Sequence, residues 1–428
     1  VRPVPKVLAV LPEVRAAKVV LPVALLAAVS ALPFGLSVAH TNLASALFIY
    51  CIVAVSMVIL TGWAGEVSLG QMAFVGIGAA VSGTLNAHYH WDLTVTVLSA
   101  AVVGTLAAVL VGLPALRIRG LFLGVSTLAF ALATSAYLLN RQYVHVLPNQ
   151  LTTPVARQPV FGRWDIRGER PFFYLCLAVL LVALWAARGL KSTRTARVLV
   201  AGRDNERALQ AYGINATRTR LMAFALAGFF ASFAGGLLAI HQQEVGTQLY
   251  APEESIRVLT MVVVGGLATI PGALLGTVFV QATTWFNSLV PAAFRFLFSF
   301  AGSGVGLVAV LFFIPGGLGA LIYRARDAAL VRVAARRGIV VPTLTADTED
   351  PALAAARPRG LGFWWNRPDA TDWARRHPRT LGRRGRRSPS RQLRSSWIKE
   401  VGHTALGVAQ CGLVIWRVRL HHPHGWAH

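Results

Sequence analysis

Long runs without a charged residue alternate with short charged segments along most of the chain. A helix needs about 20 consecutive apolar residues to cross the hydrocarbon core of a bilayer. Most of the uncharged runs reach that length, so each predicts one membrane-spanning helix. The pattern therefore indicates an all-α polytopic membrane protein. The runs that fit one helix each are 19–39, 43–65, 67–91, 93–116, 120–140, 171–187 and 221–243.

The run at 258–294 is too long for one helix, and Gly265-Gly266 and Pro271-Gly272 interrupt it. Broken helices are tolerated at membrane depth where the backbone is buried in protein or lines a cavity. We therefore predict a broken, re-entrant pair of half-helices. A last run, 296–323, ends at Arg324. The whole pattern predicts roughly eight full spans plus this pair, that is, about 8–10 membrane segments.

The composition supports a membrane protein and changes how its charge is interpreted. Hydrophobic residues make up 55% of the chain and charged residues 14%, whereas soluble proteins carry about 25% charged residues. The formal net charge is +24, from 41 Lys and Arg against 17 Asp and Glu. In a soluble protein this charge would indicate nucleic-acid binding. In a membrane protein, cytoplasmic loops collect Lys and Arg, so nucleic acid is not expected as a partner.

The distribution of charge among the loops predicts the orientation. Segment 188–220 carries eight basic residues against Asp204 and Glu206, so it is predicted to be cytoplasmic. Segment 241–255 has no Lys or Arg and is predicted to face outside. Loop 141–170 has five Arg and conflicts with the outside position that alternation gives it, but long loops follow the rule less well. Residues 1–18 and both termini are then cytoplasmic, and 19–323 form the transmembrane domain.

The remaining segment, 324–428, is predicted to be a basic tail of low order. Its part 331–428 holds 18 of the 41 basic residues and six of the 17 acidic ones. Such a tail can bind anionic lipid, and nucleic acid is a less favoured partner behind a membrane domain. The mixture of Arg, Trp, His, Pro and Gly after about residue 360 is also typical of GC-rich DNA read out of frame, which is the interpretation we favour.

Small and polar residues gather in the segment 60–79. Small residues in a membrane helix let another backbone approach closely, and polar groups at that depth need a partner or a wet cavity. The segment is therefore expected either to pack tightly against other helices, with Glu66 at the water interface, or to form a wall of a translocation path. The residues concerned are Gly62, Gly65, Glu66, Ser68, Gly70, Gln71, Gly76 and Gly78.

The basic segment contains a short amphipathic pattern from 203 to 215, followed by a second helix that enters the membrane. Gly213 is expected to stop the first helix. The pattern is either a solvated surface helix or a docking helix for a cytoplasmic partner, bound by helix-in-groove recognition. The residues that we assign to docking are Arg203, Asp204, Asn205, Glu206, Arg207, Ala208, Leu209, Gly213 and Ile214.

These two stretches and the broken segment, with Gly265, Gly266, Gly272 and Gly276, occur in an order that resembles the permease subunit of branched-chain amino-acid ABC importers (LivM-type). The family's glycine-rich pattern is matched by Gly62-Trp-Ala-Gly-Glu-Val-Ser-Leu-Gly-Gln-Met-Ala-Phe-Val-Gly-Ile-Gly78, and its Arg-Asp-Asn-Glu loop by 203–215. The resemblance covers 19–323.

The resemblance implies an importer assembled from several chains in the cytoplasmic membrane of a prokaryote. It implies a second permease subunit, two cytoplasmic ATPases on the coupling loops and an extracytoplasmic binding protein, with ATP and Mg used by the ATPases. It further implies contacts of Glu206 and Arg207 with the ATPase, and groove filling by Ala208, Leu209 and Ile214. The transported substrate is expected to be a branched-chain amino acid, with urea, amides or another amino acid as alternatives.

Two other classes of protein are weighed against this one. An ion-coupled transporter or channel needs ionisable residues within its spans, and Glu66 is the best candidate there. A membrane enzyme needs clustered ligands, and His88, His90 and Asp92 have poor metal-ligand spacing. The chain has no Gly-x-x-x-x-Gly-Lys-[Ser/Thr] phosphate loop, so it is not expected to hydrolyse ATP with that motif or to hold a cofactor or metal.

Overall fold

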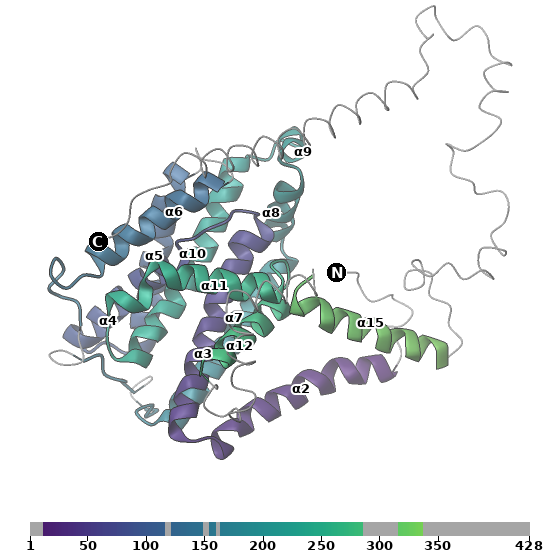
Figure 1. Cartoon of the computed structure of the whole chain (residues 1–428), viewed down its shortest axis with the longest axis horizontal. Helices are drawn as coiled ribbons and strands as arrows, with labels where there is room; N and C mark the ends of the chain where they lie inside the picture. Colours follow the sequence, from purple (N-terminus) through teal and green to yellow (C-terminus); the bar gives the residue numbers. More distant parts are fainter. Residues whose placement is uncertain (1–11, 116–120, 149–153, 160–162, 286–315, 337–428) are drawn as a thin grey trace, which may run out of the picture. The chain divides into compact units, whose positions relative to one another are not determined.

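The computed structural model describes residues 12–115, 121–148, 154–159, 163–285 and 316–336 (Figure 1). They belong to the first of two units of the chain, Val1–Leu344. The second unit, Thr345–His428, lies outside the described residues, and so do the expectations for the tail beyond Arg336. Within the described ranges the regular elements are helices, as the sequence predicts.

Helices follow one another along the described chain, most of them after short connections, while the long segment 139–168 separates η2 from α7. Five of them are long and apolar enough to cross a membrane: α2, α3 with its extension η1, α5, α7 and α10. Two shorter apolar helices are α6 with η2, and α12. The elements are α2 (Pro12–Gly35), α3 (Val38–Met57), η1 (Val58–Trp63), α4 (Gln71–Tyr89), α5 (Leu93–Ala115), α6 (Leu121–Ala133), η2 (Thr134–Leu138), α7 (Glu169–Ser192), α8 (Arg194–Asp204), α9 (Glu206–Ala211), α10 (Ala216–Gln242), η3 (Thr247–Tyr250), α11 (Pro252–Gly265), α12 (Ile270–Trp285) and α15 (Leu318–Arg336).

The core forms where α3 and α10 pack against their neighbours. Helix α10 packs against α4, α5 and α3, while α3 also contacts α7, α11 and α12. Most side chains of α3 and η1 are buried, because this run is apolar on every side and is enclosed by other helices. Small residues allow the close packing. At Gly228, for example, an added Cβ would lie 2.2 Å from the Cβ of Ala108.

Helix α2 differs from the single span predicted at 19–39. It begins at Pro12 and ends at Gly35, and α3 begins at Val38 behind the cap residue Ser37. The predicted run therefore extends across two helices. Most of the α2 side chains whose burial is described are exposed. An exposed apolar surface of this kind is typical of a segment that contacts a membrane or another protein.

The predicted broken pair is present as an antiparallel hairpin. Helix α11 ends at Gly265, Gly266 has φ +110°, and α12 begins at Ile270. Helix α15 continues to Arg336, so the first part of the predicted low-order tail, 324–336, is helical. The predicted run 296–323 lies mostly outside the described residues.

Candidate coupling site and path-lining segments

The glycine-rich segment 60–78 begins as the π-helix η1 and continues as a turn before α4. π-Helical turns often occur at functional sites. In the turn, Gly65 has φ +76°, a conformation that glycine adopts without strain. The hydroxyl of Thr61 donates to the Glu66 carbonyl over 3.1 Å, and the backbone N–H of Leu69 donates to Oγ1 of Thr127 over 3.0 Å. The turn is therefore held by its own residues and by α6.

Close backbone contacts explain the glycines of this segment. A Cβ at Gly62 would lie 2.0 Å from the carbonyl oxygen of Leu267, which belongs to the turn between α11 and α12. The same kind of contact occurs at Gly70 and Gly78, whereas a Cβ at Gly76 would meet the side chains of Leu139 and Tyr250. Two polar members of the segment, Ser68 and Gln71, are fully buried. The geometry thus fits the helix-packing interpretation, and a role in the translocation path stays a prediction.

The glycines of the broken segment bring the two helices of the hairpin into direct contact. A Cβ at Gly265 would lie 2.1 Å from the carbonyl oxygen of Gly272, and one at Gly276 would lie 1.9 Å from that of Met261. Gly62 contacts Leu267 at the hairpin turn. The glycine-rich segment and the broken segment, which the sequence analysis treats separately, are therefore in direct contact.

The predicted coupling loop, 188–220, contains two short helices instead of the one predicted from 203 to 215. Helix α8 runs through Asp204, and Asn205 separates it from α9. The Asn205 side chain caps α9 by accepting from the N–H of Ala208 over 3.0 Å, which satisfies a free donor at the helix start. Gly213 has φ +76° and ends the turn after α9, as expected, and Asn215 caps α10.

The faces of α9 differ from the predicted docking surface. Leu209 is only 5% exposed and packs near Gly202, so it is not available to fill a groove on a partner. Arg207 and Ala208 are exposed, and Tyr212 is 85% exposed. Ile214 is half-buried. The prediction for Leu209 is wrong because this small helix needs an apolar side chain to attach it to its own protein.

Arg220 joins the coupling loop to the glycine-rich segment. Its Nε lies 2.9 Å from Oε1 of Glu66, and its Nη2 lies 2.8 Å from Oε2 of Glu206. A second arginine, Arg203, donates to the carbonyl of Gly62 over 2.5 Å. Both arginines thus link the loop to the turn around Gly65.

These residues line a pocket of about 420 Å³ between the glycine-rich turn and the helices α8, α9 and α10. The side chains of Arg220, Glu66 and Glu206 are 21%, 12% and 24% exposed, so their ion pairs are partly shielded from water and are less screened than surface pairs. The sequence treats Arg220 only as one loop charge. Its position could have indicated the ion pairs, because Arg220 lies in the first turns of a predicted membrane helix, where a charged side chain needs a partner.

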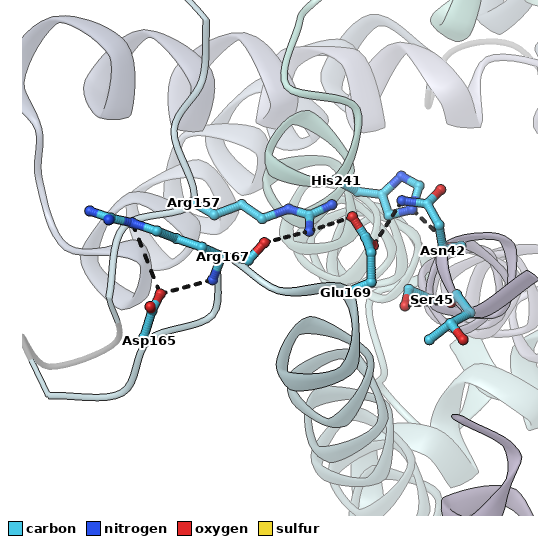
Figure 2. A network of polar contacts seen from close by, with 8 residues as sticks. Asn42, Ser45, Arg157, Asp165, Arg167, Glu169 and His241 are labelled. Atoms are coloured by element: carbon cyan, nitrogen blue, oxygen red, sulfur yellow. Dashed lines mark hydrogen bonds and ion pairs between the residues drawn. The ribbon is translucent and has the colours of Figure 1, made fainter. Parts of the chain in front are cut away.

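A second polar network lies at the other end of α10 (Figure 2). Nη1 of Arg157 lies 2.8 Å from Oε1 of Glu169, and the Arg157 guanidinium stands 4.4 Å from the centre of the Phe172 ring. Nδ2 of Asn42 donates to Oε2 of Glu169 over 3.0 Å, and Nε2 of His241 lies 3.0 Å from the Asn42 carbonyl oxygen. The network ties the loop before α7 to α3, α7 and α10.

This network bears on the five arginines of loop 141–170. The Arg157 side chain is only 5% exposed and is paired with Glu169, so it does not add a free charge to the loop surface.

In the described residues no group of three or more His, Cys, Asp and Glu side chains could hold a metal ion. His88 instead contacts the Val146 carbonyl, and Asp92 accepts from the N–H of Thr94.

The apolar helices and the broken hairpin define a polytopic membrane protein. Comparison with known families agrees, because the model of the family "Branched-chain amino acid transport system / permease component" matches residues 40–314. The chain therefore belongs to this family of permease components.

Curated relatives agree with the family. The chain is 31% identical over 267 residues to the high-affinity branched-chain amino acid transport system permease protein LivM of Salmonella typhimurium strain LT2, covering 58% of this chain and 63% of the relative. It is 31% identical over 268 residues to the protein of the same name in Escherichia coli strain K12, with the same coverage. The chain thus spans less than two thirds of the length of these relatives.

A more distant relative is named for the import of a different substrate. The autoinducer 2 import system permease protein LsrC of Enterobacter sp. strain 638 is 31% identical over 222 residues, covering 50% of this chain and 61% of the relative. No solved structure matches the chain.

Proposed function

We propose that this chain is the membrane subunit of an ATP-binding-cassette importer that carries branched-chain amino acids across the cytoplasmic membrane. The observation that carries the proposal is the attachment of the coupling loop to the glycine-rich segment by Arg220. A transporter powered by a separate ATPase needs a mechanical link from its docking surface to the segments that line its path, and this ion-paired contact can supply one.

The ATPase surface that we propose is the outer face of α9. Arg207, Ala208 and Tyr212 are exposed there, while Leu209 and Glu206 attach the helix from within. An exposed aromatic side chain beside a basic one is typical of the residues that dominate binding energy at interfaces. ATP and Mg are used by the ATPase subunits in this proposal, and a second permease subunit and an extracytoplasmic binding protein complete the importer.

The names of the relatives support the choice of substrate. Two of them are permeases of branched-chain amino acid systems, and we propose leucine, isoleucine and valine as substrates. The autoinducer 2 permeases make that molecule a second candidate, beside the urea, amides or other amino acids that the family resemblance allows.

An ion-coupled transporter is the competing class. Such a transporter needs an ionisable residue that binds the coupling ion, and Glu66 is the best candidate in the sequence. The contact of Glu66 with Arg220 instead favours a structural role for that carboxylate. A carboxylate that carries protons or cations through a transport cycle has to exchange them freely, whereas an adjacent guanidinium favours the charged form and competes with cations.

The test is uptake of labelled leucine by cells with and without the gene, with and without ATP depletion. Loss of an ATP-dependent component on deletion supports the proposal. Excess unlabelled isoleucine, valine, urea and autoinducer 2 are added separately, so that competition identifies the substrate class. Gene-dependent uptake that survives ATP depletion and follows an ion gradient would contradict the importer.

A further inference from the structure

A third group of polar residues lies along the α11–α12 hairpin, away from its turn. Nη1 of Arg257 lies 3.3 Å from Oε1 of Glu254, and Nη2 of Arg257 donates to Oε1 of Gln281 over 3.0 Å. Arg257 thus joins the two helices. Charged and amide side chains between helices of a transport domain are costly, and they mark candidate functional sites.

Two hydrogen-bonding atoms next to Arg257 have no partner. The second carboxylate oxygen of Glu254, Oε2, and the amide nitrogen of Gln281, Nε2, are both buried without a hydrogen bond. Gln281 as a residue is only 1% exposed. Leaving a buried donor or acceptor unpaired costs about 1–3 kcal/mol, and more for a charged group. A free acceptor and a free donor therefore lie on either side of one guanidinium.

A tyrosine adds another free donor near this group. Tyr250 precedes α11, is fully buried, and its hydroxyl has no hydrogen-bond partner. Burial raises the pKa of the Tyr250 phenol, to which Tyr50 and Glu244 also contribute, so the hydroxyl keeps its proton. Tyr50 interacts electrostatically with Tyr250 and also with Glu254 and Arg257, which places the four side chains in one neighbourhood.

One side of the group is open. The side chains of Glu254 and Arg257 are 26% and 31% exposed, while Gln281 and Tyr250 are enclosed. The charged side chains are therefore partly accessible, whereas Oε2 of Glu254 and Nε2 of Gln281 are themselves covered, so a solute contacts these two atoms only when the side chains that cover them move. Within the described residues, Glu254 and Arg257 balance one carboxylate against one guanidinium. A solute that is itself dipolar, with separate positive and negative ends, complements both charges without leaving an excess of either sign.

We propose that Glu254, Arg257 and Gln281 form a recognition site for the ammonium and carboxylate groups of an α-amino acid. The ammonium group donates to Oε2 of Glu254, and the carboxylate accepts from Nε2 of Gln281 and from Arg257. Charge-assisted hydrogen bonds of this kind are about twice as strong as neutral ones. The inference rests on the proposed function, and it identifies where in the chain the substrate's backbone groups bind.

The location of the site suggests how it connects to the coupling loop. Helix α11 has 14 residues, so it is about 21 Å long at 1.5 Å per residue. Glu254 is in its first turn, and its last residue, Gly265, leads to the turn where Leu267 contacts Gly62. The hairpin thus has the recognition site at one end and the Arg203–Gly62 contact of the coupling loop at the other.

The test measures labelled leucine binding to the full chain, assembled with its partner permease and ATPases in lipid nanodiscs, without the binding protein. Unlabelled leucine, 4-methylpentanoate, which lacks the ammonium group, and leucinol, which lacks the carboxylate, serve as competitors. The wild-type assembly is expected to bind leucine about tenfold or more tightly than either analogue. Equal competition by all three would overturn the site, and so would the absence of leucine binding while ATP-dependent leucine uptake is intact.

Variants assign the roles of the individual side chains. Glu254→Gln is expected to lower leucine affinity about tenfold or more and to remove the preference over 4-methylpentanoate, since only the contact to the ammonium group is weakened. Arg257→Gln should instead remove the preference over leucinol. The matched control is Glu253→Gln, which changes the exposed carboxylate next to Glu254 and should leave binding unchanged.

The outcomes separate this inference from the proposed function. If deletion of the gene leaves ATP-dependent leucine uptake unchanged, the proposed substrate is wrong. If uptake depends on the gene but Glu254→Gln and Arg257→Gln bind leucine and both analogues like the wild type, the recognition site is wrong and the importer stands. If a variant fails to assemble, the competition by 4-methylpentanoate and leucinol in the wild-type assembly still tests the recognition site.

Discussion

The Nε atom of Arg220 lies 2.9 Å from Oε1 of Glu66, although the two residues belong to different segments of the predicted machinery. Arg220 starts the membrane helix that follows the coupling loop, and Glu66 lies in the glycine-rich turn. The same guanidinium reaches Glu206 at the start of α9. A displacement of α9 by a docked ATPase would therefore be transmitted to the glycine-rich turn through the Arg220 side chain, while Arg203 holds α8 to the Gly62 carbonyl.

Removing this link should uncouple ATP hydrolysis from transport. In Arg220→Gln the ion pairs to Glu66 and Glu206 are lost, each a charge-assisted contact of about 1.5–3 kcal/mol. We expect leucine uptake to fall about tenfold or more while the assembled transporter still hydrolyses ATP. The measurement is the number of ATP molecules hydrolysed per leucine transported in proteoliposomes, which should rise.

The control for this prediction is Arg218→Gln, two residues away. Arg218 is exposed. Its backbone N–H donates to Oδ1 of Asn215, and the substitution leaves this bond in place. Its ATP-to-leucine ratio should match the wild type. An unchanged ratio in Arg220→Gln would show that coupling does not depend on this residue.

Gly62 should tolerate no side chain. A Cβ there would lie 2.0 Å from the Leu267 carbonyl oxygen and 3.1 Å from its carbon, so Gly62→Ala must separate the glycine-rich segment from the hairpin turn. Backbone atoms cannot rotate away as a side chain can, and overpacking costs about 1–3 kcal/mol or more. We expect a lower thermal midpoint of the purified subunit and reduced uptake.

Gly189→Ala is the matched control for Gly62→Ala. Gly189 lies inside α7, and no atom would contact an added Cβ within 4 Å. Alanine is favoured over glycine in a helix by about 0.5–1 kcal/mol, so this variant should be at least as stable as the wild type. Equal thermal midpoints for Gly62→Ala and the wild type would mean that Gly62 and Leu267 separate easily.

Tyr212 should matter for ATPase docking and not for folding. It is 85% exposed, so Tyr212→Ala removes little packing within the chain. Exposed tyrosines are enriched among residues whose loss costs about 2 kcal/mol or more at an interface, so the ATPase should bind roughly tenfold or more weakly to Tyr212→Ala permease. Co-purification and binding titrations in detergent measure this, and Tyr212→Phe should retain most of the affinity. Full ATPase binding by Tyr212→Ala would exclude this residue from the docking surface.

The sequence predicted the elements well and their partners poorly. Uncharged runs identify the helices, because the length needed to cross a bilayer and the cost of unpaired backbone groups are local constraints. Gly265-Gly266 likewise located the break in the hairpin. The sequence could not reveal that Gly62 contacts Leu267, that Arg220 bridges two glutamates, or that Leu209 faces inward. Those facts depend on which segments meet in three dimensions, and local patterns of hydrophobic, charged and small residues do not reveal such long-range contacts.

The Arg157–Glu169 pair should contribute to stability in a way that an exposed pair does not. Glu169→Gln leaves the Arg157 guanidinium, which is 5% exposed, without its carboxylate, and breaking a buried pair from one side costs about 3–5 kcal/mol. Because the Glu169 side chain is 25% exposed, we expect a smaller loss, about 2 kcal/mol, seen as a lower thermal midpoint.

The nearby pair of Arg167 and Asp165 provides the control for Glu169→Gln. Its side chains are 78% and 72% exposed and lie 4.0 Å apart, so Asp165→Asn should leave the thermal midpoint unchanged, since exposed pairs contribute little. The double variant Arg157→Met with Glu169→Gln should be more stable than Glu169→Gln alone, because it removes the buried charge that lacks a counter-ion. If the double variant is less stable than the single one, Arg157 stabilises the protein mainly through its 4.4 Å contact with the Phe172 ring, and the ion pair is secondary.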